Sequence, residues 1–217
     1  MTGSAPDRYP GYNVLDKRHT PSWDEPTRRV VNRRLAVSNE PRFFADREWR
    51  ILLALCARIL PQPPGRPPIP TASLLDAALF ENQTQGFRSG DLPYDAEAWR
   101  RGLAALDAEA QLAFGQGFDQ LEPASQDALL IRAQNGDLTD PAWGGMGSAR
   151  FFANRVLADI PAAYYSHPTA WSEIGFGGPA SPRGYVRMAL NRRDPWEAIE
   201  AKPDPQARIR AENRHVG

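Results

Sequence analysis

The stretch DREWRILLALCARIL at residues 46–60 carries the strongest periodic pattern in the chain. Its apolar residues recur at intervals of three and four, which places them on one face of an α-helix. They are Trp49, Leu52, Leu53, Cys56, Ile59 and Leu60. Because Ile51 and Leu55 make a second side apolar as well, this helix should lie at the centre of a core. Asp46 is the expected N-cap, and Pro61 is expected to end the helix.

Four further helices are predicted beyond a stiff, proline-rich connector at residues 61–70. They should run from Thr71 to about Gln83, from near Asp95 to Phe114, from Pro123 to a closing Gly136, and from a capping Ser148 onward. Gly102 lies inside one of them, where glycine is unfavourable, which predicts the close approach of another backbone.

The last of these helices is rich in large apolar residues. Phe151, Phe152, Val156 and Ile160 are expected to point inward. Pro161 lacks a backbone N–H and should kink or end the helix.

The fold class is therefore predicted to be all-α, since no short run of alternating apolar and polar residues indicates a strand. We expect a single helical domain of about five helices with long irregular arms at both ends. The expected segments are an N-terminal arm at residues 1–45, the helical domain at 46–163, a strap at 164–187 and a C-terminal tail at 188–217. Short helices are expected at Thr27–Leu35 and Trp196–Ala201, and the last dozen residues should fray.

The strap YYSHPTAWSEIGFGGPASPRGY at residues 164–185 combines aromatic residues with three prolines and four glycines. Proline fixes φ and glycine permits positive φ, so an extended segment with several turns is predicted. Its aromatic side chains need a surface to pack on, supplied either by this chain or by a partner. If a partner supplies it, Trp171→Ala should weaken the complex by about 2 kcal/mol and barely change melting of the isolated chain.

Composition excludes several classes of partner. The formal net charge is zero, so the chain lacks the basic footprint of a nucleic-acid-binding protein. No apolar run is long enough for a membrane helix or a signal peptide. Lys17 and Lys202 are the only lysines, and all other basic residues are arginine. A codon bias would explain this composition, and arginine is also favoured in ion pairs at protein interfaces.

The sequence offers little for catalysis, metal binding or cofactor binding. A single cysteine, Cys56, excludes an intrachain disulfide and a haem attachment motif. The histidines, His19, His167 and His215, do not have the spacing of a metal site. The pair Gly115 and Gly117 fails the dinucleotide fingerprint, because no strand precedes it and residue 120 is glutamine.

The chain resembles a known family at its aromatic residues. The helix end FFANRVLADIPAAYYSHP, the tryptophan that leads into Ile174-Gly175-Phe176, and Gly184-Tyr185 are similar to the C-terminal signature of the gluconate 2-dehydrogenase subunit 3 family. The resemblance extends over about residues 43–187. One departure is Pro168-Thr169-Ala170, which stands where that family commonly has a Gly-Gly-Asn segment.

The resemblance implies a subunit without a cofactor of its own. Members of the family accompany a large FAD-dependent dehydrogenase of the glucose-methanol-choline type that oxidises a sugar, glycoside or polyol. We therefore expect the FAD in the partner, no catalytic, cofactor or metal site here, and a role in stabilising or maturing the large subunit and shaping its substrate entrance. The expected partner-binding residues are Tyr164, Tyr165, His167, Trp171, Ile174, Phe176 and Tyr185.

Two other functions stay open at this point. A self-contained helical enzyme would use His167 and Glu173 as a general acid and base. A helical adaptor for an unrelated partner would need neither residue.

The compartment is predicted from the absence of an export signal. The pairs Arg28-Arg29 and Arg33-Arg34 are not followed by an apolar segment, unlike the twin-arginine signal that many relatives carry. A cytoplasmic location is expected for the sequence as given, and a periplasmic one if a partner exports the chain or a leader has been removed.

Overall fold

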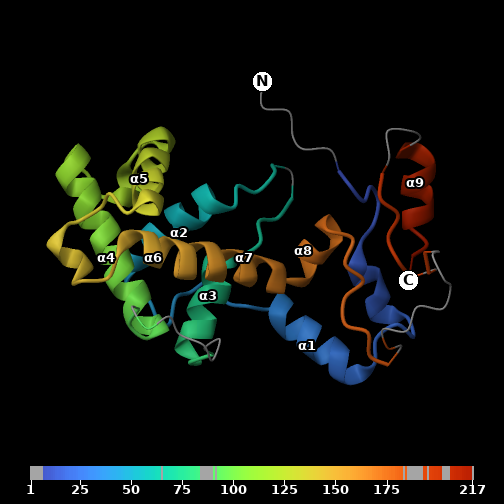
Figure 1. Cartoon of the computed structure of the whole chain (residues 1–217). Helices are drawn as coiled ribbons and strands as arrows, with labels where there is room; N and C mark the ends of the chain where they lie inside the picture. The colour runs from blue at the N-terminus through green and yellow to red at the C-terminus, as the bar shows by residue number, and fades with distance from the viewer. Residues whose placement is uncertain are drawn as a thin grey trace. The chain divides into compact units, whose positions relative to one another are not determined.

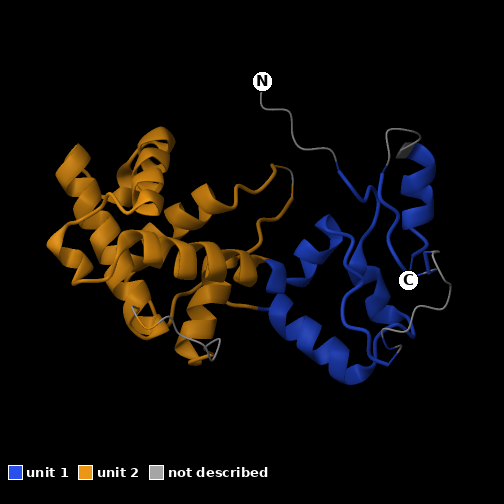
Figure 2. Ribbon diagram, in the orientation of Figure 1, with its two compact units in different colours: residues 1–36, 165–217 blue, residues 37–164 orange. Residues whose placement is uncertain are grey.

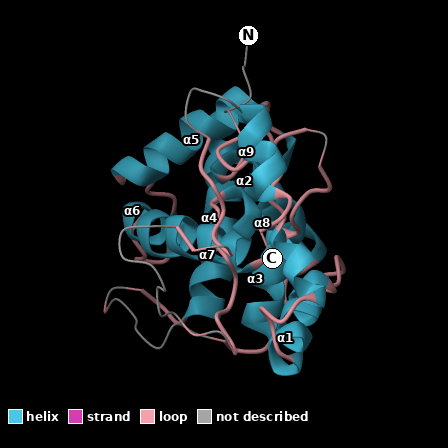
Figure 3. Ribbon diagram, turned by 90° about the vertical axis from the view of Figure 1, so that its right-hand side faces the viewer, coloured by secondary structure: helices cyan, strands magenta, loops and turns pink. Residues whose placement is uncertain are grey.

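The computed structural model describes residues 7–64, 66–83, 90, 92–182, 184, 193–194, 196–201 and 206–216. Within these ranges it contains α-helices and short 3₁₀ turns but no strand, which confirms the all-α class (Figure 3). The chain divides into two compact units, one of residues 1–36 and 165–217 and the other of residues 37–164 (Figure 2). We call them unit 1 and unit 2 and describe each by itself.

Unit 2 contains the helices predicted for the central domain (Figure 1). They are α2 (Asp46–Ile59), α3 (Thr71–Phe80), α4 (Asp95–Phe114), α5 (Pro123–Asn135), α6 (Ser148–Phe151) and α7 (Leu157–Ser166). A π-helical turn at Phe152–Val156 joins α6 to α7, so these form one continuous helical segment, which runs into unit 1 at residue 165. Pro123 opens α5 and Gly136 closes it with φ of +83°, as predicted.

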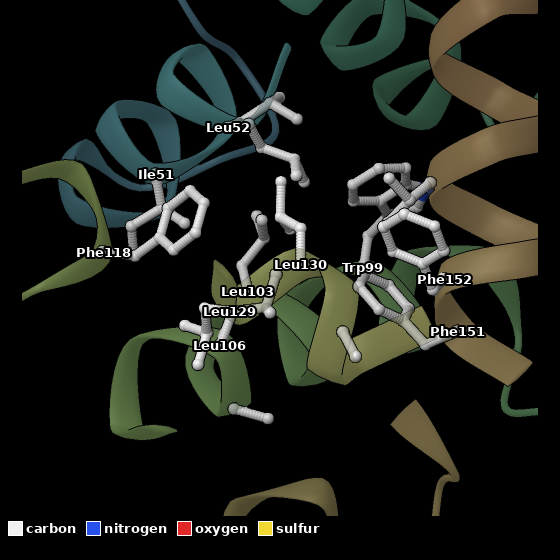
Figure 4. Packing of buried hydrophobic residues seen from close by; sticks show 14 of the residues in the cluster. Ile51, Leu52, Trp99, Leu103, Leu106, Phe118, Leu129, Leu130, Phe151 and Phe152 are labelled. Carbon is white, nitrogen blue, oxygen red and sulfur yellow. The ribbon is translucent and has the colours of Figure 1, made fainter. Parts of the chain in front are cut away.

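The core of unit 2 surrounds α2 and α4 (Figure 4). Trp99 and Leu103 of α4 are fully buried, and the Trp99 ring meets the Phe151 ring edge to face at a centroid distance of 5.5 Å. A Cβ atom at Gly102 would overlap the Phe151 ring. The close approach predicted at Gly102 is therefore real, but a side chain and not a backbone makes it.

Three predicted N-caps were wrong by one residue. Ala45, Pro70 and Gly147 hold the N-cap positions, and Asp46, Thr71 and Ser148 are the first residues of their helices. At α2 the side-chain acceptor comes from within the first turn, because the Glu48 carboxylate accepts the Ala45 N–H at 2.8 Å.

Pro161 does not end its helix, which was one of the two outcomes predicted for it. Helix α7 continues through Pro161 to Ser166. Proline removes one N–H donor, whereas Ile160 and Tyr164 on either side of it are both buried. Their packing keeps the segment helical where local propensity would end it.

Unit 1 brings the two ends of the sequence together. Its elements are the 3₁₀ helix η1 (Val14–His19) and the helices α1 (Glu25–Leu35), α8 (Pro168–Glu173) and α9 (Gln206–Asn213). The short helix predicted at Thr27–Leu35 is confirmed as part of α1. A second buried cluster holds this unit together, formed by Tyr12, Val14, Trp23, Val31, Trp171 and Val216.

Three predictions for unit 1 were wrong. Residues 168–173 of the strap are helical and not extended, because His167 caps the segment and Pro168 occupies the first helical position. In the tail, residues 196–201 are not helical, and α9 lies where fraying was expected. The Asn213 side chain of α9 bonds both the N–H and the C=O of Ile199, at 2.7 and 2.9 Å, which holds that backbone outside a helix.

Candidate partner-binding surface

The strap from Tyr165 onward packs against residues 9–31 of the N-terminal arm of its own chain, and both stretches belong to unit 1. The Tyr12 hydroxyl donates to the carbonyl of Phe176 at 3.2 Å, and the Val14 N–H donates to Ser172 Oγ at 3.1 Å. Farther along, the Ser181 hydroxyl donates to Asp24 Oδ2 at 2.9 Å. These three hydrogen bonds join residues 12–24 of the arm to residues 172–181 of the strap.

Two glycines allow this close contact. Gly175 has φ of +67° and lies against the Tyr9 ring, and Gly178 has φ of +73° and lies against the Trp23 ring. A Cβ at Gly178 would be 2.6 Å from a carbon of the Trp23 ring. Both positions thus require glycine for its backbone conformation and for its lack of a side chain.

Trp171 is the buried anchor of the strap. Only 4% of it is exposed, and it packs in the cluster that contains Tyr12, Val14 and Trp23. Its Nε1 donates to the carbonyl of Tyr165 at 2.7 Å, and its ring meets the Phe176 ring edge to face at 5.5 Å. The surface that the sequence left unassigned, own chain or partner, is supplied for Trp171 by the chain's own arm.

His167 serves as the N-cap of α8. Its Nδ1 accepts the Thr169 N–H at 3.4 Å, and 7% of the residue is exposed. Desolvation lowers the pKa of His167 from the ordinary value of 6.5. Glu173 lies at the opposite end of the same helix, and no hydrogen bond or ion pair joins these two described residues. His167 and Glu173 are therefore not joined directly to each other.

The other predicted partner-binding residues divide by exposure. Tyr165, Ile174 and Phe176 are 41%, 44% and 40% exposed, which is high for large apolar side chains. Tyr164 is buried at the end of unit 2, and Tyr185 lies outside the described residues. The exposed three lie in sequence on either side of Trp171, whose own contacts fix the backbone at Tyr165 and the ring of Phe176.

The described residues contain no group of three or more His, Cys, Asp or Glu side chains able to hold a metal ion. Cys56 is buried in the core of unit 2, where desolvation raises the pKa of its thiol to about 12, so it is not a reactive thiolate. A cavity of about 390 Å³ opens at the loop of residues 136–150, beside Trp143, Met146 and Arg150.

No helix in the described part of the chain is both long enough and apolar enough to cross a membrane.

Comparison with known proteins now gives the family. The family model described as Gluconate 2-dehydrogenase subunit 3 matches residues 46–178, which is more than half of the chain. The chain belongs to the gluconate 2-dehydrogenase subunit 3 family. No curated protein and no solved structure matches it. The family match covers α2 to α8 and continues along the strap to residue 178. The arm at residues 1–45 and the segment after residue 178 lie outside it.

Several buried polar residues were not identified from the sequence. Lys17 of the arm is fully buried, as is the carboxylate of Asp76, which accepts the N–H groups of Phe43 and Phe44, each at 3.0 Å. Asp159 accepts the Trp99 indole N–H at 2.8 Å, and burial raises the pKa of its carboxyl group. A charge in a periodic pattern looks like a solvent-facing residue, so no local signal distinguishes these positions.

Proposed function

We propose that this chain is the non-catalytic small subunit of a flavin-dependent dehydrogenase complex that oxidises a sugar, glycoside or polyol. On this proposal, a large subunit of the glucose-methanol-choline type holds the FAD and the catalytic groups. The small subunit stabilises or matures the large one and contributes to its substrate entrance. Family membership carries the proposal, since the family is described as a subunit of gluconate 2-dehydrogenase.

The strap is the surface that we propose for the contact. Tyr165, Ile174 and Phe176 expose large apolar side chains on either side of Trp171 in sequence, at the C-terminal part of the family match. Aromatic residues are enriched among the few that dominate binding energy at interfaces. The buried contacts of Trp171 hold their backbone in place, so binding would require little ordering of the strap. His167 and Trp171, which are buried in unit 1, would support this surface.

Co-purification with a large glucose-methanol-choline-type flavoprotein from the same genome tests the proposal. We expect the double variant Ile174→Ala, Phe176→Ala to weaken the complex by about 2 kcal/mol or more, because two exposed apolar contacts are lost. The melting temperature of the isolated chain should change little, since both side chains are already partly in solvent.

The matched control removes apolar area of similar exposure elsewhere. Leu157→Ala on α7, where the leucine is 45% exposed, should leave the affinity unchanged. A flavoprotein that stays soluble and fully active without this chain, and does not co-purify with it, would refute the proposed function.

A further inference from the structure

Lys17 joins three separate segments of unit 1. It lies on η1 of the N-terminal arm, and its ammonium Nζ donates to the carbonyl of Trp196 at 2.6 Å and to that of Gly177 at 3.4 Å. The first acceptor belongs to the tail and the second to the strap. The same Nζ lies 5.6 Å from the centre of the Tyr12 ring. A single cation thus links the arm, the strap and the tail.

The complete burial of Lys17 is unusual for its residue type. None of its surface is exposed, whereas lysine is among the residues least often fully buried. Burying an ammonium group is unfavourable unless hydrogen bonds compensate it. An apolar residue of the same length would fill the space without that penalty. The hydrogen bonds that Lys17 donates therefore explain why this position holds a lysine.

The atoms that Lys17 holds lie directly beside the proposed partner-binding surface. Gly177, whose carbonyl it binds, follows Phe176, and the Phe176 carbonyl accepts the Tyr12 hydroxyl. The Phe176 N–H donates to the Trp171 carbonyl at 2.9 Å. The backbone around Phe176 is therefore fixed from the N-terminal side by α8 and from the C-terminal side by the arm.

We propose that Lys17 is a positioning residue for partner binding, because it locks the strap loop of residues 174–178 into the conformation that presents Ile174 and Phe176. It acts through the loop and does not itself touch the partner. This inference rests on the proposed function. It also gives a role to the arm, which lies outside the family match.

Lys17→Met is the direct test, since methionine keeps an unbranched side chain and removes the charge and the donors. We expect the backbone amide of Phe176 to exchange with solvent at least about tenfold faster, because the loop opens more often. Affinity for the co-expressed flavoprotein should fall about tenfold, in proportion to the smaller fraction of chains with a binding-competent loop. Amides of α4 should keep their exchange rates.

A milder variant covers the case in which Lys17→Met prevents unit 1 from folding. Tyr12→Phe removes the hydroxyl that bonds the Phe176 carbonyl and leaves the ring in its cluster. It should shift loop exchange and affinity in the same direction by about threefold, as expected for one neutral hydrogen bond. Arg18→Met is the matched control, because Arg18 bonds Asn32 and none of the strap residues described.

The two readouts separate the possible failures. Unchanged exchange at Phe176 in Lys17→Met would overturn the locking role, whatever the partner does. Faster exchange with unchanged affinity would overturn the positioning role. If the wild-type chain does not bind the flavoprotein at all, the proposed function fails, and exchange at Phe176 still decides whether Lys17 locks the loop.

Discussion

At the scale of single residues, the protonation of His167 should make the stability of the strap depend on pH. Its Nδ1 must be unprotonated to accept the Thr169 N–H at the start of α8. Burial lowers the pKa of the folded state below the ordinary value of 6.5. A lowered histidine pKa means that folding favours the neutral form, so its stabilisation is complete above pH 6.5 and is lost as the pH falls below that value through the folded-state pKa.

We therefore expect unit 1 to lose about 1 kcal/mol of stability between pH 7.5 and pH 5, which is the usual contribution of an N-cap. Urea unfolding at several pH values measures this loss. In His167→Asn the loss should be absent, because asparagine can cap the helix and does not titrate. The other two histidines remain in both proteins, so the difference isolates His167. Identical pH profiles for the two proteins would exclude this role.

At the scale of elements, α8 and the arm depend on each other through Trp171. The tryptophan is buried by Tyr12, Val14 and Trp23 of the arm, so its removal should leave a cavity inside unit 1. Trp171→Ala should lower the free energy of unfolding of unit 1 by about 3 kcal/mol, the usual cost of such a truncation. Hydrogen exchange at α8 amides measures the change, with the amides of α4 in unit 2 as an internal reference.

The sequence left open whether the strap packs on its own chain or on a partner, although it placed Trp171 among the expected partner-binding residues. Ile174→Ala serves as the control, because an exposed side chain leaves no cavity. Unchanged exchange at α8 together with a weaker complex would return Trp171 to the partner interface.

The elements also show what sequence patterns can and cannot predict. Helix α4 was predicted from its apolar stripe and α5 from its proline and glycine, because periodicity and capping are local properties. The continuation of α7 through Pro161 and the position of α9 depend on packing and on distant hydrogen bonds, such as those from Asn213 to Ile199. Such contacts join residues far apart in sequence and leave no local signal.

The candidate site likewise has features that the sequence predicts and features that it does not. The aromatic, proline and glycine content of the strap identified it in the sequence, and the family resemblance indicated that it binds a partner. That content does not predict which strap residues are buried and which are exposed, because their burial depends on contacts with the arm. A local sign that the arm packs on a surface is its content of apolar residues, Tyr12 and Trp23 among them, which a disordered tail would not carry.

At the scale of the whole molecule, a net charge of zero conceals a division between the units. Unit 1 has 15 basic and 10 acidic residues, whereas unit 2 has 11 basic and 16 acidic ones, counted along the sequence. Part of the positive charge of unit 1 lies on α1. Arg29 and Arg33, one turn apart and exposed, have no ion pair among the described residues, whereas Arg28 pairs with Glu25 at 3.2 Å.

Uncompensated charge of one sign steers association more than it adds affinity. If unit 1 carries the partner-binding surface, the positive charge should speed its encounter with an acidic region of the flavoprotein. The double variant Arg29→Ser, Arg33→Ser should slow association by about threefold to tenfold at low salt and leave dissociation nearly unchanged. Stopped-flow or surface-binding kinetics at two salt concentrations would measure both rates.

The control for this experiment is Arg132→Ser, which removes an exposed arginine from α5 of the negatively charged unit. It should not slow association. Salt should reduce the association rate of the wild-type chain and have less effect on the double variant, because screening acts on the charges that the variant has lost. An association rate that responds neither to salt nor to the loss of Arg29 and Arg33 would show that the charge of unit 1 has no part in recognition.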